Sequence, residues 1–248
     1  MSIQLQNIYT GLSGLVLPGP KATYPPAFQS KSRLEYYSHL FSSIEINSSF
    51  YKTPQRATVA KWGASVPDNF KFSFKLSKAI THVKGLVFDE AALEDFMDSI
   101  AQVGDKKGCL LIQFPPSLRM NKLDKLQRLL SSIAWLNEQQ WQLSVEFRHS
   151  SWYEKEVTEI LKEYQAITVL QDKPAAATPA EWEQSDTVYL RLHGPNGNYK
   201  GCYEPAFLQQ QASNIKAWQK AGKKVYCYLN NTMGSALQNI QTLNGFLI

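Results

Sequence analysis

The sequence has few cysteines, and none of them forms a redox or metal-binding pair. Cys109, Cys202 and Cys227 are widely spaced along the 248 residues, and no Cys-x-x-Cys spacing occurs. An odd number of scattered cysteines argues against a disulfide framework or a structural zinc site and is typical of a reducing compartment. We therefore expect a cytoplasmic protein.

Long apolar runs and blocks of like charge are also absent. Met1–Leu5 shows no basic stretch followed by a long apolar segment, so we expect no signal peptide. No segment reaches the roughly 20 apolar residues that a membrane-spanning helix needs, and we expect no membrane partner. The formal net charge of +5 favours anionic partners only mildly, well short of a dedicated nucleic-acid-binding protein. The glycine-rich phosphate loops of nucleotide-binding proteins are missing as well.

What the sequence does contain is about eight strand patterns separated by helical patterns. The first strand is expected near Asn7–Thr10. Seven further strands become polar or charged toward their carboxyl ends: Ser43–Asn47, Phe70–Leu76, Leu110–Phe114, Leu143–Arg148, Ile167–Asp172, Val188–His193 and Val225–Asn230. Buried parallel strands are normally apolar throughout. A closed barrel that is covered by helices and has a polar mouth reconciles the two observations.

We therefore predict an α/β fold, with a single TIM-type (β/α)8-like barrel domain over residues 1–248. The Ala/Pro-rich segment 173–184 predicts that one connecting helix is weak or missing. An open doubly wound sheet would give the same strand pattern, so periodicity alone leaves both architectures open.

Alternation along each strand predicts which side chains face inward. If the apolar alternate residues face the helices, the inner face is polar. It consists of Glu45, Asn47, Ser73, Lys75, Gln113, Glu146, Arg148, Asp172, Arg191, His193, Tyr228 and Asn230. Two interpretations remain open for this set. It is either a ligand site at the strand ends or a network of paired charges that fills the barrel.

Several blocks resemble, in order, the signature of the domain of unknown function 72 family (YecE-like proteins), a bacterial and archaeal group. They are Glu45–Tyr51, Phe70–Lys75, Ile80–His82, Gln113–Pro116, Val145–His149 with Trp152, Arg191–Gly194 and Leu229–Asn231. The resemblance runs from about Gly11 to the C-terminus. It implies a TIM-barrel-like fold with a polar cleft at the strand carboxyl ends, and no established reaction. Leu15 departs from the pattern, because the family usually has Trp after the Gly-x-Ser-Gly that stands here at Gly11–Gly14.

Three residues are the candidates for catalysis. Glu146 and His193 are expected to move protons, and Lys75 is expected to act with Arg148 and Arg191 on an anion. The expected substrate-binding residues are Glu45, Asn47, Tyr51, His82, Gln113, Arg148, Trp152, Asp172, Arg191, Tyr199, Asn230 and Asn231. Among them Tyr51, Trp152 and Tyr199, together with Tyr203, are candidates for an aromatic rim.

The residue set supports two classes of function. The first is an enzyme that transforms an anionic or phosphorylated substrate by acid/base chemistry. The second is a non-catalytic binding module for a phosphorylated metabolite or nucleic acid. We expect no cofactor. We also expect no metal, because the three cations of the inner face, Lys75, Arg148 and Arg191, would repel a divalent ion. A metal-dependent phosphodiesterase, with ligands from Glu45, Glu146, Asp172 and His193, is a further alternative.

Overall fold

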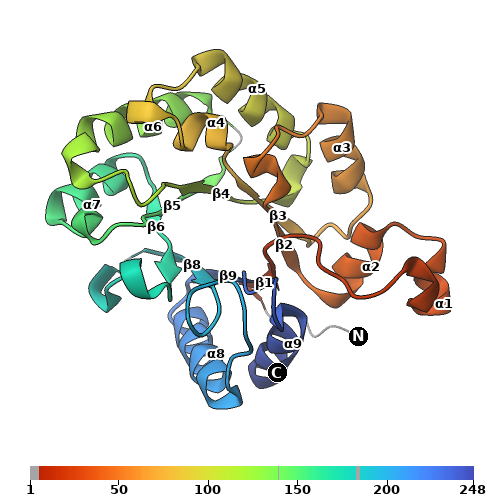
Figure 1. Ribbon diagram of the computed structural model, residues 1–248. Coiled ribbons are helices and arrows are strands. Elements are labelled where there is room, and N and C mark those ends of the chain that lie inside the picture. Colours follow the sequence, from red (N-terminus) through yellow and green to blue (C-terminus); the bar gives the residue numbers. More distant parts are fainter. Residues whose placement is uncertain (1–5, 139, 183–184) are drawn as a thin grey trace.

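Strands and helices alternate along the chain in the computed structural model, which describes residues 6–138, 140–182 and 185–248 (Figure 1). The strands are β1 (Ile8–Leu12), β2 (Ser43–Ile46), β3 (Lys71–Lys75), β4 (Lys107–Gln113), β5 (Gln142–Glu146), β6 (Ile167–Thr168), β7 (Leu170–Gln171), β8 (Thr187–Leu192) and β9 (Lys224–Leu229). Every strand pair is parallel. The predicted α/β class with parallel strands is therefore confirmed.

The strands form two sheets instead of one continuous ladder. One sheet has the order β1-β9-β8-β7 and the other β2-β3-β4-β5-β6. Val169 separates β6 from β7, and its amide donates to the Val145 carbonyl at 2.9 Å. On the opposite side, β1 and β2 meet at a single parallel bridge between Ser13 and Glu45. The prediction of a single closed barrel is not confirmed, because the strand ladder is interrupted at these two places.

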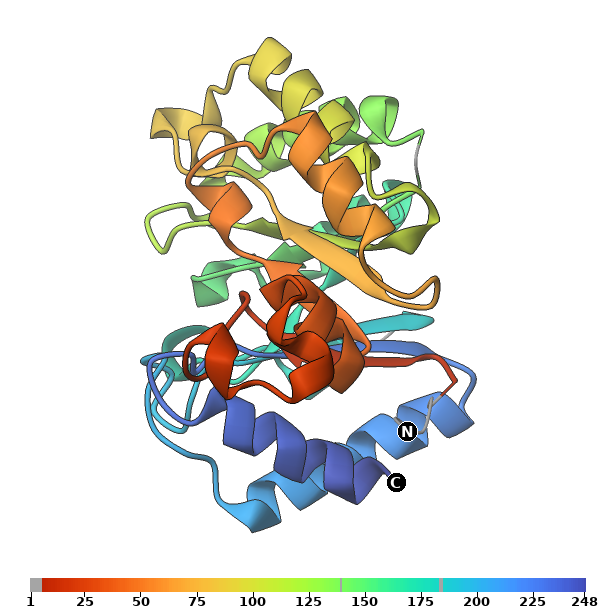
Figure 2. The ribbon, with the colours of Figure 1, turned by 90° about the vertical axis from the view of Figure 1, so that its right-hand side faces the viewer.

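Helices lie on the outer sides of both sheets (Figure 1). They are α1 (Pro26–Gln29), α2 (Arg33–Leu40), α3 (Arg56–Ala64), α4 (Lys78–Thr81), α5 (Glu90–Ala101), α6 (Leu123–Leu136), α7 (Lys155–Glu163), α8 (Pro205–Lys220) and α9 (Ala236–Leu247). Figure 2 shows α8 and α9 side by side beneath the four-stranded sheet. Between β7 and β8 the described residues form only two 3-10 turns, Pro174–Ala176 and Ala180–Trp182, which agrees with the expected weak connection. None of the helices in the described ranges is long and apolar enough to cross a membrane.

Two hydrophobic clusters follow from the alternation of the strands. Outward residues such as Ile44, Phe72 and Leu190 pack against the helices. A second cluster fills the space between the sheets and consists of Cys109, Leu111, Ile167, Val169, Tyr189, Tyr226 and Tyr228. The Tyr228 hydroxyl reaches the Oγ atoms of Ser43 at 2.5 Å and Ser73 at 2.9 Å, on the other sheet. The two sheets therefore share an interior, closed by side chains from both.

The inward or outward direction of one predicted residue is wrong. Gln171 pairs with the inward Arg191 in the ladder, whereas Leu170 pairs with the outward Leu190. Asp172 therefore follows the outward face and borders a hollow against α8, beside Leu190. The period of two predicts the face only when its phase is known, and here the interior Val169 sets that phase.

Candidate functional site

A cavity of about 630 Å³ opens at the carboxyl ends of the strands. Its walls come from both sheets, since Ser13 follows β1, Lys75 ends β3 and Asn230 follows β9. The predicted site residues that line it are Asn47, Tyr51, Lys75, His82, Gln113, Arg148, Arg191, Tyr199 and Asn230. Side chains from distant parts of the sequence thus meet where parallel α/β proteins commonly bind ligands.

The floor of the cavity is a chain of ion pairs formed by Glu45, Arg191, Glu146 and Arg148, in which the two arginines border the cavity and the two carboxylates lie beneath it. Arg191 donates from Nε and Nη2 to Glu45 Oε2 and Oε1, at 2.8 and 2.7 Å. Its Nη1 donates to Glu146 Oε2 at 2.7 Å, and Arg148 Nη2 pairs with Glu146 Oε1. The Tyr189 hydroxyl adds a bond to Glu45 Oε2 at 2.5 Å. These charges are almost completely buried, so they depend on one another for stabilisation.

The pairing fixes the charge of both carboxylates. Burial alone would raise the pKa of Glu45, but the Arg191 guanidinium holds it below its usual value. Burial also works against ionisation of Glu146, yet Arg148 and Arg191 together lower the pKa of that carboxyl. Both groups are therefore ionised at neutral pH. This environment fits the alternative of a structural ion pair better than it fits proton transfer by Glu146.

His193 lies in the same buried layer and is neutral. Its Nε2 is 3.0 Å from Arg148 Nη2 and 3.2 Å from Arg191 Nη1. Because both neighbours are donors, Nε2 accepts and the ring proton resides on Nδ1, which faces Asp172 Oδ1 at 3.3 Å. Burial lowers the pKa of His193, although Asp172 opposes the shift. The ring is fully buried and is not part of the cavity wall.

Asp172 supports this histidine from behind. The His193 backbone N–H donates to Asp172 Oδ1 at 2.8 Å, and the Tyr203 hydroxyl donates to Oδ2. The same hydroxyl accepts from the Gly194 N–H at 2.5 Å. Neither Asp172, predicted to contact substrate, nor Tyr203, predicted at the rim, lines the cavity. Both residues position His193 and the loop that follows it.

Two further predicted residues do not reach the cavity. Trp152 is fully buried on the helix side, where its ring stacks on Phe147 with 4.9 Å between centroids and Nε1 donates to the Leu118 carbonyl at 2.8 Å. Asn231 is buried and donates to Asn239 Oδ1 at 2.9 Å, which ties the end of β9 to α9. Trp152 is therefore a core residue, because Phe147, the first residue after β5, packs with it in the outer hydrophobic cluster.

The cavity wall itself carries polar groups with few partners. Lys75 Nζ lies 4.0 Å from the centre of the Phe50 ring, and no hydrogen bond or ion pair joins it to the described residues. Burial, together with the nearby Arg191, lowers the pKa of Lys75 to about 8. Asn47 Oδ1 and Arg148 Nε are buried and have no partner within the described part of the chain. A bound ligand would satisfy such groups.

The rim combines a neutral histidine with tyrosines. His82 Nδ1 is 2.8 Å from Thr81 Oγ1, and partial burial together with Lys75 lowers the pKa of His82 to about 4. Tyr51 is 70% exposed, and the Tyr199 hydroxyl accepts from Arg148 Nη1 at 3.4 Å. The rim thus carries a neutral imidazole and two phenol rings, and the wall below them contains the cations Lys75, Arg148 and Arg191.

Several contributors were missed by sequence reasoning. Phe50 lies under Lys75, and Lys173 and Met233 line the cavity. Tyr189 stands two residues before Arg191 on the same strand and therefore on the same face, so extending the alternation would have found it. Lys173 and Met233 stand in irregular segments, where no periodicity applies.

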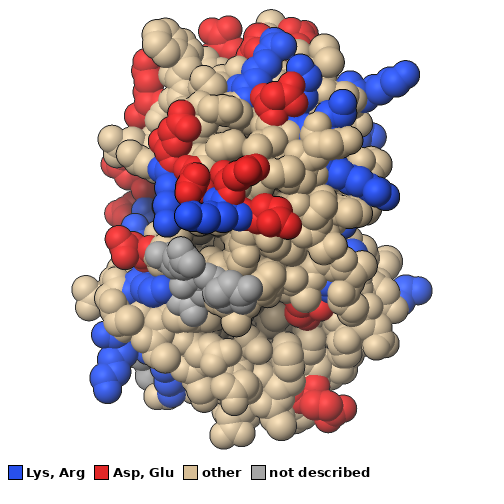
Figure 3. All heavy atoms as spheres, turned by 90° about the vertical axis from the view of Figure 1, so that its left-hand side faces the viewer, with Lys and Arg blue, Asp and Glu red and all other residues tan. Residues whose placement is uncertain are grey.

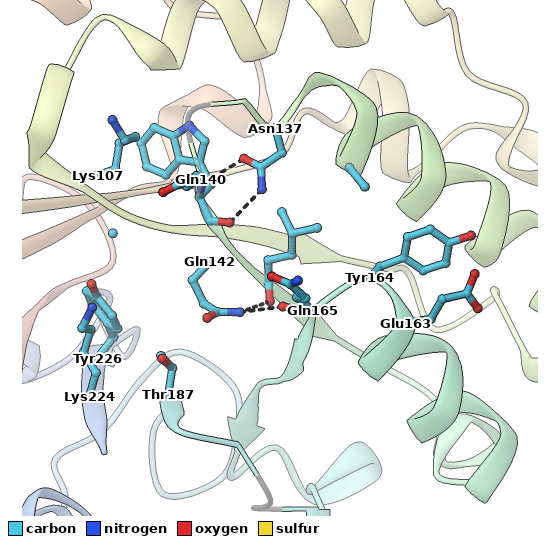
Figure 4. Close-up of a pocket in the computed structure, with 14 residues that line it drawn as sticks. Lys107, Asn137, Gln140, Gln142, Glu163, Tyr164, Gln165, Thr187, Lys224 and Tyr226 are labelled. Carbon is cyan, nitrogen blue, oxygen red and sulfur yellow. Dashed lines mark hydrogen bonds between the residues drawn. The ribbon is translucent and has the colours of Figure 1, made fainter. Parts of the chain in front are cut away.

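A second cavity, of about 640 Å³, lies at the amino ends of the strands (Figure 4). Its wall mixes amide, charged and aromatic side chains, and two of the amides bond the neighbouring backbone. Asn137 Nδ2 donates to the Trp141 carbonyl and Gln142 Nε2 to the Gln165 carbonyl, both at 2.9 Å. These bonds brace the loops that precede β5 and β6, so the two ends of the strands differ in chemistry.

The fold and the site define an α/β protein with parallel sheets and a polar cavity at the strand carboxyl ends. The chain belongs to the family described as Protein of unknown function DUF72, whose model matches residues 9–247. The family resemblance seen in the sequence is thus confirmed.

Relatives and solved structures agree with this membership. The chain is 25% identical to the UPF0759 protein YunF of Bacillus subtilis (strain 168), over 92% of this chain and 89% of the relative. It is also 25% identical to the UPF0759 protein YecE of Escherichia coli (strain K12), over 49% of this chain and 43% of that protein. Crystal structures of DUF72 family proteins from Thermotoga maritima MSB8 and Enterococcus faecalis V583 superpose with TM-scores of 0.78 and 0.77. Their identities are 23% and 20%, with coverage of 97% of this chain and 98% and 95% of theirs, which indicates a shared fold.

Proposed function

We propose that the cavity binds a small anionic or phosphorylated substrate. The observation that carries the proposal is an imbalance of pairing. Glu45 and Glu146 are held beneath the cavity by Arg191 and Arg148, whereas Lys75 has no carboxylate partner in the described chain. A buried cation without a partner is costly, and an anionic ligand would offset that cost.

The position of the cavity supports the same conclusion. We infer that the two sheets act together as one barrel-like domain. On one side the bridge between Ser13 and Glu45 joins β1 to β2, and on the other side only Val169 interrupts the chain between β6 and β7. The cavity is then the barrel mouth, the usual place for active sites in that architecture.

Acid/base chemistry, if the protein is an enzyme, falls to Lys75 in this proposal. Lys75 has a pKa near the working pH and lies in the cavity wall. Glu146 and His193 lie below it, where the first stays ionised and the second stays neutral. We propose that these two act as positioning residues that fix the Arg148 guanidinium.

A thermal-shift titration with inorganic phosphate at low ionic strength tests the proposal. Wild-type protein should gain stability with phosphate, and Lys75→Met should lose most of that gain. The matched control is Lys84→Met, since Lys84 is an exposed lysine outside the cavity wall and its removal should leave the gain unchanged. Equal gains in wild type and Lys75→Met would contradict the proposal.

A non-catalytic binding module for a phosphorylated metabolite is the second candidate. Glu146 stays ionised and His193 stays neutral, which favours this candidate, because binding requires no group to change its protonation state. Steep salt dependence without turnover would support the module, and formation of a defined product would support the enzyme.

The other two alternatives have less support. Basic and acidic side chains are interspersed on the face around α7, which offers no continuous basic surface for nucleic acid there (Figure 3). For the metal-dependent phosphodiesterase, the described ranges contain no group of three or more His, Cys, Asp or Glu residues arranged to hold a metal ion.

A further inference from the structure

Lys75 differs from the other charged residues of the cavity in its surroundings. Its backbone is held on both sides, since its carbonyl accepts from Ser49 Oγ at 2.7 Å and the next amide, of Leu76, donates to the Leu111 carbonyl at 2.9 Å. Its Nζ lies over the Phe50 ring at 4.0 Å. The backbone of Lys75 is thus held in place, and its amine stands in the cavity wall against an aromatic ring.

The charged groups around this amine come from four other elements. Glu45 lies on β2, Glu146 and Arg148 at the end of β5, and Arg191 on β8, while His82 follows α4. The two carboxylates pair with the arginines. The pKa of Lys75 is therefore lowered mainly by burial and next by the Arg191 charge. A lysine desolvated next to another cation is the arrangement that activates an amine as a nucleophile.

We propose that Lys75 forms an imine with an oxo acid, a small molecule that carries a carbonyl group beside an anionic group. This inference rests on the proposed anion site and names its substrate class. Two residues of the cavity wall fit the rest of such a ligand: the Arg148 guanidinium is a cation for the acid group, and the Asn47 amide, whose Oδ1 has no partner among the described residues, can bond a hydroxyl.

The step balances without any further reactant. Free Lys75 amine attacks the carbonyl carbon, and a C–N bond forms while the carbonyl π bond breaks to give a carbinolamine. Loss of the hydroxyl as water then breaks the C–O bond. Counted from the ammonium form, two of its three protons leave with the carbonyl oxygen as water, and one remains on the iminium nitrogen.

Reductive trapping tests the inference on the intact protein. Wild-type chain is incubated with glyoxylate and sodium cyanoborohydride at pH 8, and the adducts are located by peptide mass mapping. An amine with a pKa of about 8 is about half free at this pH, roughly a hundredfold more than an unperturbed lysine of pKa about 10.4. We expect the first adduct at Lys75, ahead of the exposed Lys84. Adducts on exposed lysines with Lys75 unmodified would overturn the inference.

Two controls separate a shaped site from a merely reactive lysine. Glycolaldehyde, a neutral aldehyde, should label Lys75 more slowly than glyoxylate does, and excess inorganic phosphate should slow only the glyoxylate reaction at this residue. The Lys75→Arg variant should lose the fast adduct, whereas Lys84→Arg should keep it. Equal labelling by both aldehydes would overturn the inference, because the anion would then play no part.

The same measurements distinguish this inference from the proposed function on which it rests. Stabilisation by phosphate that depends on Lys75, without a selective glyoxylate adduct, would remove the imine and leave the anion site. Failure of both phosphate stabilisation and selective trapping would remove both.

Discussion

The buried ion pairs and the cavity wall above them use the same residue types in opposite ways. In the lower layer, each charge of Glu45, Arg191 and Glu146 faces an opposite charge, and all three side chains are almost completely buried. In the upper layer, Lys75 and the Asn47 amide oxygen lack protein partners. Side chains on neighbouring strands therefore differ in their surroundings: those of the lower layer are paired across the two sheets, and those of the upper layer are the ones that we propose contact a ligand.

Glu146→Gln should have the largest effect, because it leaves two guanidinium groups facing a neutral amide. We expect a loss of about 3–5 kcal/mol in the free energy of unfolding at pH 7, measured by urea denaturation. The exposed pair between Arg56 and Asp98, at 3.0 Å, supplies the control, and Asp98→Asn should change stability by less than about 1 kcal/mol. A neutral or stabilising Glu146→Gln would return Glu146 to the upper layer as a candidate for proton transfer.

The difference in unfolding free energy between wild type and Glu146→Gln should depend on pH in a definite direction. Because the pKa of Glu146 is lower in the folded protein than in the unfolded chain, its contribution is fully present above about pH 4.3. It is lost as pH falls toward the still lower folded value. The gap between wild type and Glu146→Gln should therefore stay constant from pH 5 upward and narrow only in acid.

Tyr189→Phe should have an intermediate effect. It removes the hydroxyl that donates to Glu45 Oε2 at 2.5 Å, although the same oxygen still accepts from Arg191 Nε. We expect a loss of about 2 kcal/mol, as for other hydrogen bonds to buried charges, by urea denaturation. The phosphate-induced shift should survive, because the change lies entirely in the lower layer. Loss of that shift would show that the two layers are coupled.

Lys75→Met should change stability in the opposite direction. Removing a buried, unpaired charge gains more than the loss of the contact with Phe50 costs, so we expect about 1 kcal/mol of stabilisation at pH 7. The pKa of Lys75 is about 8 when folded and about 10.4 when unfolded, so wild-type stability rises with pH between these values. The advantage of the variant should shrink over that range in denaturation curves. A destabilised variant at pH 7 would place Lys75 in the lower layer.

Sequence reasoning could predict the face of a side chain but not its depth. Flanking isoleucines and leucines correctly turned Glu45 and Arg191 inward, and both lie between the sheets. The alternation does not indicate whether an inward side chain lies in the buried layer or in the cavity wall, since that depends on where the neighbouring strands end. Glu146 and His193 were therefore predicted as chemical groups although they lie beneath the cavity.

The remaining errors have local causes. Asp172 follows a strand interrupted after two residues, so its phase could not be read from the apolar pattern. Trp152 lies in a 3-10 turn after β5, where strand periodicity has ended and only tertiary packing decides direction. The signature blocks, in contrast, led to the correct family because they span nearly the whole chain.

Tyr51→Ala should have the smallest effect on stability and a measurable effect on ligand choice. The side chain is 70% exposed, so we expect a change in unfolding free energy within about 0.5 kcal/mol. Its ring stands at the cavity rim, where stacking on a planar ligand is worth about 0.5–1.5 kcal/mol, or about two- to twelvefold in affinity. Phenyl phosphate should therefore bind more weakly to the variant, while inorganic phosphate should bind as before.

Trp135→Ala is the matched control for this last comparison. Trp135 lies on α6, is 85% exposed and is not part of the cavity wall. Its removal should change the affinity for neither ligand, because an exposed aromatic side chain outside the cavity does not contact a ligand bound in it. An equal loss of phenyl phosphate affinity in both variants would mean that the ring binds nonspecifically to the surface. A loss confined to Tyr51→Ala, with unchanged stability, would support the proposal that Tyr51 contacts a ligand at the cavity rim and contributes little to the stability of the fold.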